Sequence, residues 1–206
     1  MDIERRIFDV KLETREHNDE SPKIVGYASV FNSLSENLGG FREQIEPGAF
    51  DDALGDDVRA LFNHDPNMIL GRTTAGTLSI SSDENGLRYE IDPPNTTVGR
   101  DLMVSLQRGD ITQSSFGFTV EDDSWSEDDD GRVIRTIHKV RNLFDVSPVT
   151  YPAYPEASVS ARALDKVAEM RKPPEETDEE IQDETPDDLG LIEQDLEVLE
   201  LSAPQV

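Results

Sequence analysis

The stretch ITQSSFGFTV, residues 111–120, alternates small or polar side chains with aromatic ones. Such alternation is typical of a β-strand with one face in the core. Ser114 and Ser115 stand side by side in it, before the run FGF. The acidic segment EDDSWSEDDDG, residues 121–131, comes next, and the apolar-rich run RVIRTIHKVRNLFDVSPV, residues 132–149, follows it. The region therefore predicts a strand, a long polar turn closed by a glycine, and a second strand.

The rest of the first part of the chain also favours strands, with a few helices between them. The expected strands are RIFDVKLE (6–13), KIVGYASVFN (23–32) and a hairpin around DENG within residues 76–94. The expected helices are EPGAFDDALG (46–55), NTTVGRDLMVSLQRG (95–109), capped by Asn95 or Thr96 and ended by Gly109, and PEASVSARALDKVAEM (155–170). This mixture predicts a mainly β, α+β domain built round a barrel or a strongly bent sheet.

Composition removes several classes of site. The chain has 206 residues and no cysteine, which excludes disulfides, thiolate metal sites and a cysteine nucleophile. The start, MDIERRIFDVKLETRE, has no apolar core typical of a signal peptide, and no apolar run reaches the roughly 20 residues needed to span a bilayer. We therefore expect a soluble protein made in a cytoplasm, with no contact to a membrane.

The formal net charge is −26. A surface this acidic repels the phosphates of nucleic acids and anionic lipids, so direct nucleic acid binding is not expected. Lysine is scarce and aspartate abundant, a balance that suits high salt, where screening removes the self-repulsion. The acidity therefore indicates a halophilic host. The other interpretation, that the acid lies mainly in a disordered tail, explains only part of it, because aspartate and glutamate are dense elsewhere too.

A composition shift divides the chain into residues 1–165, the expected folded domain, and residues 166–206. The second part contains KPPEETDEEIQDETPDDLG, which has too few apolar side chains to offset the entropy of ordering and is expected to be disordered. Near the end, residues 189–201 place leucine and isoleucine at helical spacing, which predicts a short amphipathic helix. This helix is either a frayed terminus or a docking element for a partner or for another copy of the chain.

His64 and Ser115 are the first candidates for chemistry. His64 lies in FNHDP, where an apolar run meets a turn, and an imidazole there can act as a general base near neutral pH. A strand serine such as Ser115 attacks only when a base takes its proton. Gly117, two residues further on, would leave room for a substrate backbone. Each residue also has an inert interpretation, as a turn histidine and an ordinary strand serine.

A third group has to orient the histidine, and three residues are candidates. Asp145 interrupts an apolar strand, where a buried carboxylate needs a partner. His138 lies earlier on the same predicted strand, and Asp65 is the neighbour of His64. A metal site is not indicated, because the chain has no HExxH motif and the acidic segment lacks the EF-hand spacing. No cofactor is expected.

Four motifs in order resemble the prohead (capsid maturation) proteases of tailed viruses with the HK97-type capsid. They are IVGYASVFN with FREQIEPGAFDDAL, VRALFNHDPNMILGRT, GDITQSSFGFTV, and LFDVSPVTYPAYPEASV, and they run from about residue 24 to 162. Each motif is weak alone, but the four together, in the family's order, are specific.

The resemblance implies a serine endopeptidase with a closed β-barrel surrounded by a few helices, similar in fold to the herpesvirus assembly proteases. It implies His64 as the general base and Ser115 as the nucleophile. It implies Asp145 as the third member, although the family usually has glutamate at this position and this chain carries a shorter acid there. The herpesvirus relatives use a second histidine, and His138 is the alternative third member by that analogy.

The resemblance also implies where the protein acts. The expected substrates and partners are scaffold protein, the scaffold-like segment of the major capsid protein, and the chain's own tail. The expected place is the assembling prohead in the host cytoplasm, where we expect a homo-oligomer. The competing hypothesis is a capsid scaffold or assembly protein that keeps the fold but is catalytically idle.

The acidic composition generates a prediction about salt. Because screening relieves the repulsion between carboxylates, the free energy of unfolding should rise from low to molar potassium chloride. Urea unfolding at both salt concentrations measures it. Equal stability in both would contradict adaptation to a halophilic host.

Overall fold

The computed structural model describes residues 3–9, 12–15, 22–151 and 161–171. They belong to a compact unit, Met1–Lys172, which is separate from Pro173–Val206. The predicted disordered tail and its helix at 189–201 lie outside the described residues and stay predictions. The boundary expected at residue 165 falls inside a helix, α2 (Ala161–Met170).

Both α-helices of the described residues come after the first eight strands of the chain. The elements are β1 (Glu4–Asp9), β2 (Glu13–Arg15), β3 (Lys23–Val30), β4 (Phe41–Ile45), η1 (Asp51–Ala53), β5 (Arg59–Phe62), β6 (Asp65–Arg72), η2 (Thr73–Ala75), β7 (Leu78–Ser82), β8 (Gly86–Ile91), α1 (Thr97–Arg108), β9 (Gln113–Glu127), β10 (Val133–Val149) and α2.

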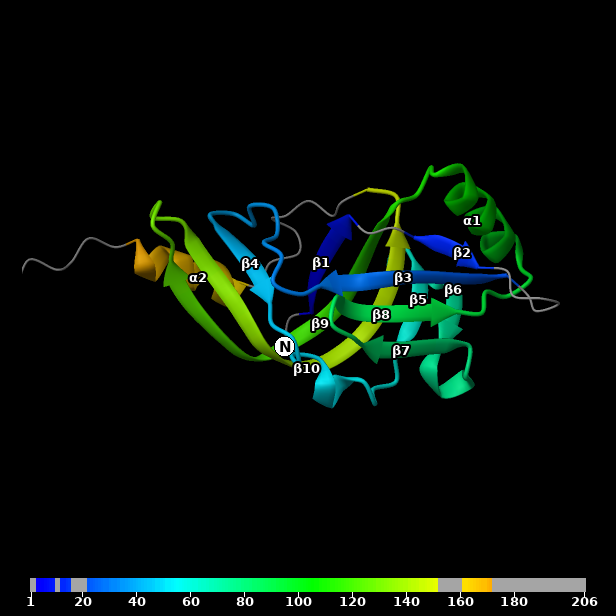
Figure 1. Cartoon of the computed structure of the whole chain (residues 1–206), viewed down its shortest axis with the longest axis horizontal. Coiled ribbons are helices and arrows are strands. Elements are labelled where there is room, and N and C mark those ends of the chain that lie inside the picture. The colour runs from blue at the N-terminus through cyan, green and yellow to red at the C-terminus, as the bar shows by residue number, and fades with distance from the viewer. Residues whose placement is uncertain (1–2, 10–11, 16–21, 152–160, 172–206) are drawn as a thin grey trace, which may run out of the picture. The chain divides into compact units, whose positions relative to one another are not determined.

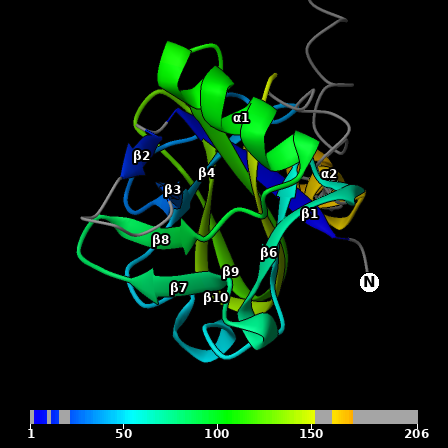
Figure 2. The same ribbon diagram turned by 90° about the vertical axis from the view of Figure 1, so that its right-hand side faces the viewer.

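The strands form two sheets, which Figures 1 and 2 show from two sides. One has the order β1-β9-β10-β5-β6, with β4 also paired to β10, and the other has the order β2-β3-β8-β7. The chain is therefore mainly β and α+β, as expected, but the expectation of a closed β-barrel is wrong. Among the described strands no ladder joins the two sheets, and β1, β4 and β6 each pair with one strand, so the larger sheet stays open.

The antiparallel pair β9–β10 forms the centre of the larger sheet. Its register runs from Val133 opposite Glu127 to Val149 opposite Gln113. The two strands continue through most of the segment that the sequence predicted as a long acidic turn, and the turn itself is short. The cause is Trp125, whose ring packs on Phe41 with centroids 4.9 Å apart and so places this part of β9 over apolar side chains.

The helix predicted at residues 95–109 is confirmed as α1. The side chain of Thr96 caps it by accepting a hydrogen bond from the backbone N–H of Gly99, 3.3 Å away. Gly109 ends it at φ 78°, a left-handed conformation that glycine adopts at low cost. The helix predicted near Pro47 is instead only the short 3₁₀ turn η1.

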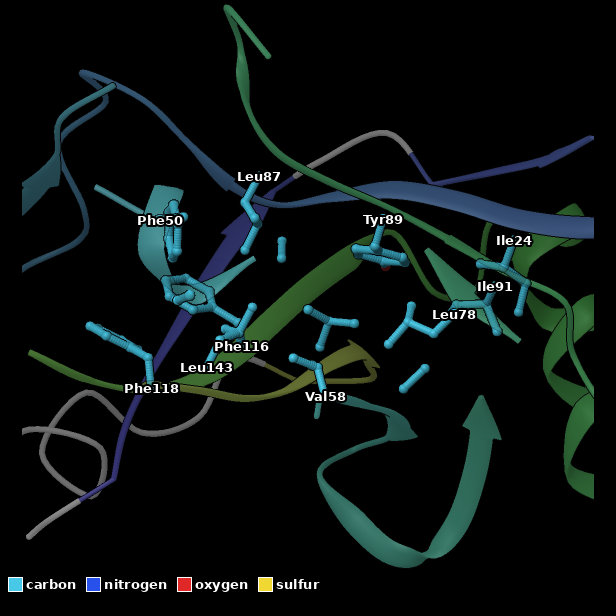
Figure 3. Packing of buried hydrophobic residues seen from close by; sticks show 14 of the residues in the cluster. Ile24, Phe50, Val58, Leu78, Leu87, Tyr89, Ile91, Phe116, Phe118 and Leu143 are labelled. Atoms are coloured by element: carbon cyan, nitrogen blue, oxygen red, sulfur yellow. The ribbon is translucent and has the colours of Figure 1, made fainter. Parts of the chain in front are cut away.

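The main core lies between the two sheets and is rich in aromatic rings (Figure 3). Phe116 of β9 stacks on Phe118 at 4.7 Å between centroids and meets the edge of Phe50 at 5.6 Å. Tyr89 of β8 is fully buried on the opposite sheet. The alternation in residues 111–120 is therefore that of a strand with one face in the core, as predicted. Its aromatic side chains lie in the core, and its odd-numbered residues lie on the other face.

A cluster of ionised side chains is buried where β1, β4, β9 and β10 meet. The guanidinium of Arg6 donates to Glu43 at 2.6 Å, and that of Arg135 donates to Glu4 at 2.8 Å and to Glu43 at 3.0 Å. Arg135 also pairs with Asp123 at 2.7 Å. Burial alone raises the pKa of Glu4, but the two arginines outweigh it and lower that pKa from its usual 4.5. The stability that Glu4 contributes is therefore present above its usual pKa and lost as the pH falls through the lowered value.

Removing one charge from this cluster should destabilise the fold strongly. Glu43→Gln leaves Arg6 and Arg135 buried with fewer carboxylates, and such a change costs about 3–5 kcal/mol of the free energy of unfolding. The matched control is Arg108→Ala, because Arg108 and its partner Asp110 are largely exposed and such pairs contribute about 1 kcal/mol or less. Urea unfolding of both variants tests the prediction, and equal losses would contradict it.

Candidate active site

Strands β9 and β10 place two of the candidate residues next to each other. In their register Ser115 is opposite Ser147, and Gly117 is opposite Asp145. Directly opposite residues of an antiparallel pair project to the same face of the sheet. Ser115 and Asp145 therefore share the face that points away from the aromatic core.

His64 reaches this face from the turn between β5 and β6. Phe62 pairs with Asp65, so the loop has only two residues, Asn63 and His64, and their φ angles are 56° and 57°. Positive φ at both central positions is the pattern of a type I′ hairpin turn, which favours asparagine. Histidine is also enriched in left-handed conformations relative to most side chains. The turn thus holds the backbone of His64 in the left-handed conformation, which histidine adopts at some cost in strain.

Asn63 fastens the same turn to the end of β10. Its backbone N–H donates to the carbonyl of Pro148 at 3.0 Å. Its side-chain oxygen accepts from the backbone N–H of Thr150 at 2.8 Å, and its side-chain amide donates to the Thr150 hydroxyl at 3.2 Å. Three hydrogen bonds therefore fix the position of His64 relative to the strand that carries Asp145.

The three side chains form a continuous hydrogen-bonded chain. His64 Nε2 lies 2.7 Å from Ser115 Oγ, and His64 Nδ1 lies 2.5 Å from Asp145 Oδ1. With the ring proton on Nδ1, His64 donates to the carboxylate and Nε2 is left to accept the serine proton. Ser115 has no exposed surface, and Asp145 is 7% exposed. The group can therefore move a proton from the serine to the histidine in surroundings largely free of water.

Ser147 joins this chain, although the sequence analysis did not single it out. Its hydroxyl donates to Asp145 Oδ1 at 2.9 Å and lies 3.4 Å from His64 Nδ1. It is fully buried. The only signal in the sequence is its place two residues after Asp145, which puts both on one face of a strand.

Gly117 has a different use from the one expected. A side chain there would place its Cβ 2.5 Å from Asp145 Oδ2 and 3.5 Å from Ile3 Cγ2. The space over Gly117 is thus occupied by the Asp145 carboxylate and is not left open for a substrate backbone. The glycine allows the acid to lie across β9.

The other candidates lie elsewhere. His138 Nδ1 contacts Glu46 Oε2 at 2.8 Å and Nε2 contacts Ser124 Oγ at 2.7 Å, so this histidine makes no hydrogen bond to Ser115 or His64. The carboxylate of Asp65 accepts from the backbone and side-chain amides of Asn67 at 2.8 and 2.9 Å.

Ser114 points into the core. Its hydroxyl lies 3.0 Å from the hydroxyl of Tyr89. Of the two neighbouring serines, only Ser115 faces the histidine.

The described residues hold neither a metal cluster nor a membrane-spanning helix. Within the part of the chain that the structure describes, no three histidine, aspartate or glutamate side chains gather as metal ligands would. In the same residues, no helix combines the length and apolar character of a membrane span.

Comparison with known proteins agrees with the motifs. The chain matches the family described as caudovirus prohead serine protease over residues 8–173. It is 31% identical over 153 residues to the prohead protease of Enterobacteria phage HK97, which covers 71% of this chain and 63% of that protein. The match therefore spans less than two thirds of the HK97 protein. The bacteriophage T4 capsid assembly protease is also similar in structure, with a TM-score of 0.46 and 12% identity over 73% of this chain and 98% of that one.

The family model matches most of the chain, and the HK97 relative is 31% identical to it. The chain therefore belongs to the caudovirus prohead serine protease family.

Proposed function

We propose that this chain is a serine endopeptidase in which Ser115 is the nucleophile, His64 the general base and Asp145 the residue that orients His64. The observation that carries the proposal is the hydrogen-bonded chain from Ser115 Oγ to His64 Nε2 at 2.7 Å and from His64 Nδ1 to Asp145 at 2.5 Å. Nucleophile, base and orienting acid within hydrogen-bond reach are the arrangement that activates a serine hydroxyl.

The reaction divides into acylation and deacylation. In acylation His64 Nε2 takes the proton of Ser115, whose Oγ forms a bond to the scissile carbonyl carbon. The carbonyl oxygen becomes an oxyanion, and the C–N bond then breaks as His64 gives the proton to the leaving amine. In deacylation a water gives its proton to His64, its oxygen attacks the acyl carbon, and the proton returns to Ser115 as the acid leaves.

Asp145 and Ser147 prepare His64 for these steps. The carboxylate holds the ring proton on Nδ1 and stabilises the imidazolium that forms after each proton transfer. The Ser147 hydroxyl donates to the same carboxylate oxygen, so it helps to compensate the burial of Asp145. Within this proposal Ser147 is a positioning residue, because it acts on His64 through Asp145.

We further propose that the substrates are scaffold protein, the scaffold-like segment of the major capsid protein, and the chain's own acidic tail. Family membership supports this set, since the family is defined by prohead proteases. Cleavage would take place inside the assembling prohead in the host cytoplasm, with the enzyme as a homo-oligomer.

The second candidate function is a catalytically idle scaffold or assembly protein. One observation favours it: Ser115 has no exposed surface, so a peptide cannot reach it without a local opening. The intact hydrogen bonds from Ser115 through His64 to Asp145 favour the endopeptidase instead.

Ser115→Ala distinguishes the two functions. We expect the wild type to shorten itself or its capsid protein over time, and Ser115→Ala and His64→Ala to leave both intact, because the first lacks the attacking oxygen and the second the base. Gels and intact mass measure the cleavage, in high and in low salt. His138→Ala is the matched control and should keep activity. If the wild type and Ser115→Ala stay equally intact with capsid protein present, the scaffold function is the better one.

Ser147→Ala should slow the chemistry without removing it. Loss of a hydrogen bond to a charged group is worth about 1.5 kcal/mol or more, which corresponds to roughly a tenfold slower reaction. The rate at which a fluorophosphonate probe labels Ser115, followed by intact mass, measures this without knowledge of the substrate. We expect the saturating rate to fall while the probe's half-saturation concentration stays constant.

The conservative variant Ser147→Thr keeps the hydroxyl and should recover part of the rate. An unchanged saturating rate in Ser147→Ala would show that Ser147 is only a packing residue.

A further inference from the structure

Strand β1 presents a second set of side chains to the face that carries Ser115. Its register with β9 places Ile7 opposite Ser115 and Arg5 opposite Gly117. The even-numbered residues of β1 face the core, where Arg6 lies over the ring of Phe118. The odd-numbered side chains therefore project to the same face as Ser115.

Ile3 lies on this face too. Its Cγ2 atom is 3.5 Å from the position that a Gly117 Cβ would take. We call Ile3, Arg5 and Ile7 the β1 triplet; it presents apolar, cationic and apolar side chains in turn.

Arg5 is the charged member of the triplet. It is exposed, and it makes no ion pair or side-chain hydrogen bond with any residue that the structure describes. The chain has 45 acidic residues against 19 basic ones, and arginines such as Arg72 and Arg135 are paired with carboxylates. Arg5, in contrast, is an available cation, and its position opposite Gly117 places it on the same face as Ser115.

Ile3 adds an exposed apolar side chain at the same place, since 48% of its surface is accessible. An arginine between apolar neighbours suits a peptide carboxylate, because the planar guanidinium can hold both oxygens while the neighbours exclude water.

Ser115 has no exposed surface, so a substrate needs a local opening, and the groups around the serine determine on which side the peptide can lie. On the β10 side Asp145 and Ser147 occupy the positions opposite Gly117 and Ser115, and His64 lies above them. The neighbour of β9 on its other edge is β1. We therefore expect a peptide whose carbonyl reaches Ser115, after such an opening and without displacing the histidine, to extend over the β1 triplet.

We propose that the β1 triplet is a substrate subsite that binds an acidic side chain close to the scissile bond, with Arg5 as the residue that selects it. The proposal rests on the endopeptidase function proposed above and adds a substrate class to it: extended peptides with aspartate or glutamate near the cleaved bond. Ile3 and Ile7 contact the apolar parts of the residues on either side of that acid.

A charge reversal tests this subsite. The wild type, Arg5→Glu and Arg5→Gln are each given a mixture of peptides of random sequence, and mass spectrometry maps the cleaved bonds. Two synthetic peptides that differ only in glutamate or lysine at the preferred position then give kcat/KM. The matched control is Arg42→Glu on β4, since Arg42 is also exposed and has no ion pair with a described residue.

The expected wild-type result is cleavage close to acidic residues. We expect Arg5→Gln to lose roughly tenfold in kcat/KM on the glutamate peptide, as for other hydrogen bonds between charged groups. Arg5→Glu should lose more and should prefer the lysine peptide, whereas Arg42→Glu should behave as the wild type does.

Two kinds of failure can be told apart. If the wild type cleaves peptides without preference for acid, or if Arg5→Glu and Arg5→Gln keep the wild-type preference, the subsite is overturned and the endopeptidase function stands. If the wild type cleaves nothing, or if Ser115→Ala cleaves as the wild type does, the endopeptidase function fails and the subsite fails with it.

Discussion

The pairing of β9 with β10 is the constraint on which the rest of the structure depends. It sets Ser115 opposite Ser147 and Gly117 opposite Asp145, and it puts the phenylalanines of β9 into the core. A slip of one residue would turn every side chain of β9 to the other face, which would bury Ser115 among aromatic rings and expose Phe116. The hydrophobic burial of Phe116 and Phe118 therefore also fixes the position of the serine.

The same ladder brings distant parts of the chain to the site. β10 pairs in parallel with β5 at Asp145 and Val146, and the short turn after β5 carries His64. On the other edge of β9, β1 is held by the buried pairs of Glu4 and Arg6 on its core side. Polar groups on one face of β1 thus secure the strand, while its opposite face carries the β1 triplet that we propose as a substrate subsite.

Three of the residues singled out from the sequence lie within hydrogen-bond reach of one another, and their catalytic roles stay a proposal. Motif order pointed to His64, Ser115 and Asp145, because each lies in a short local pattern. Local sequence did not decide between Asp145 and His138, since both lie on β10 and only its pairing with β5 shows which of them is near His64. The closed barrel was wrong for a related reason: which strands share an edge depends on long-range pairing that no local pattern records.

The position of the Asp145 carboxylate depends on two neighbours, Gly117 and Ser147. An aspartate side chain is short, so its carboxylate lies close to the strand beside it. Gly117 provides that space, since a Cβ there would be 2.5 Å from Asp145 Oδ2. Ser147 then donates to Oδ1, the oxygen that contacts His64. The orientation of Asp145 toward His64 thus depends on all three residues together: the short acid itself, the glycine that faces it, and the serine two residues later.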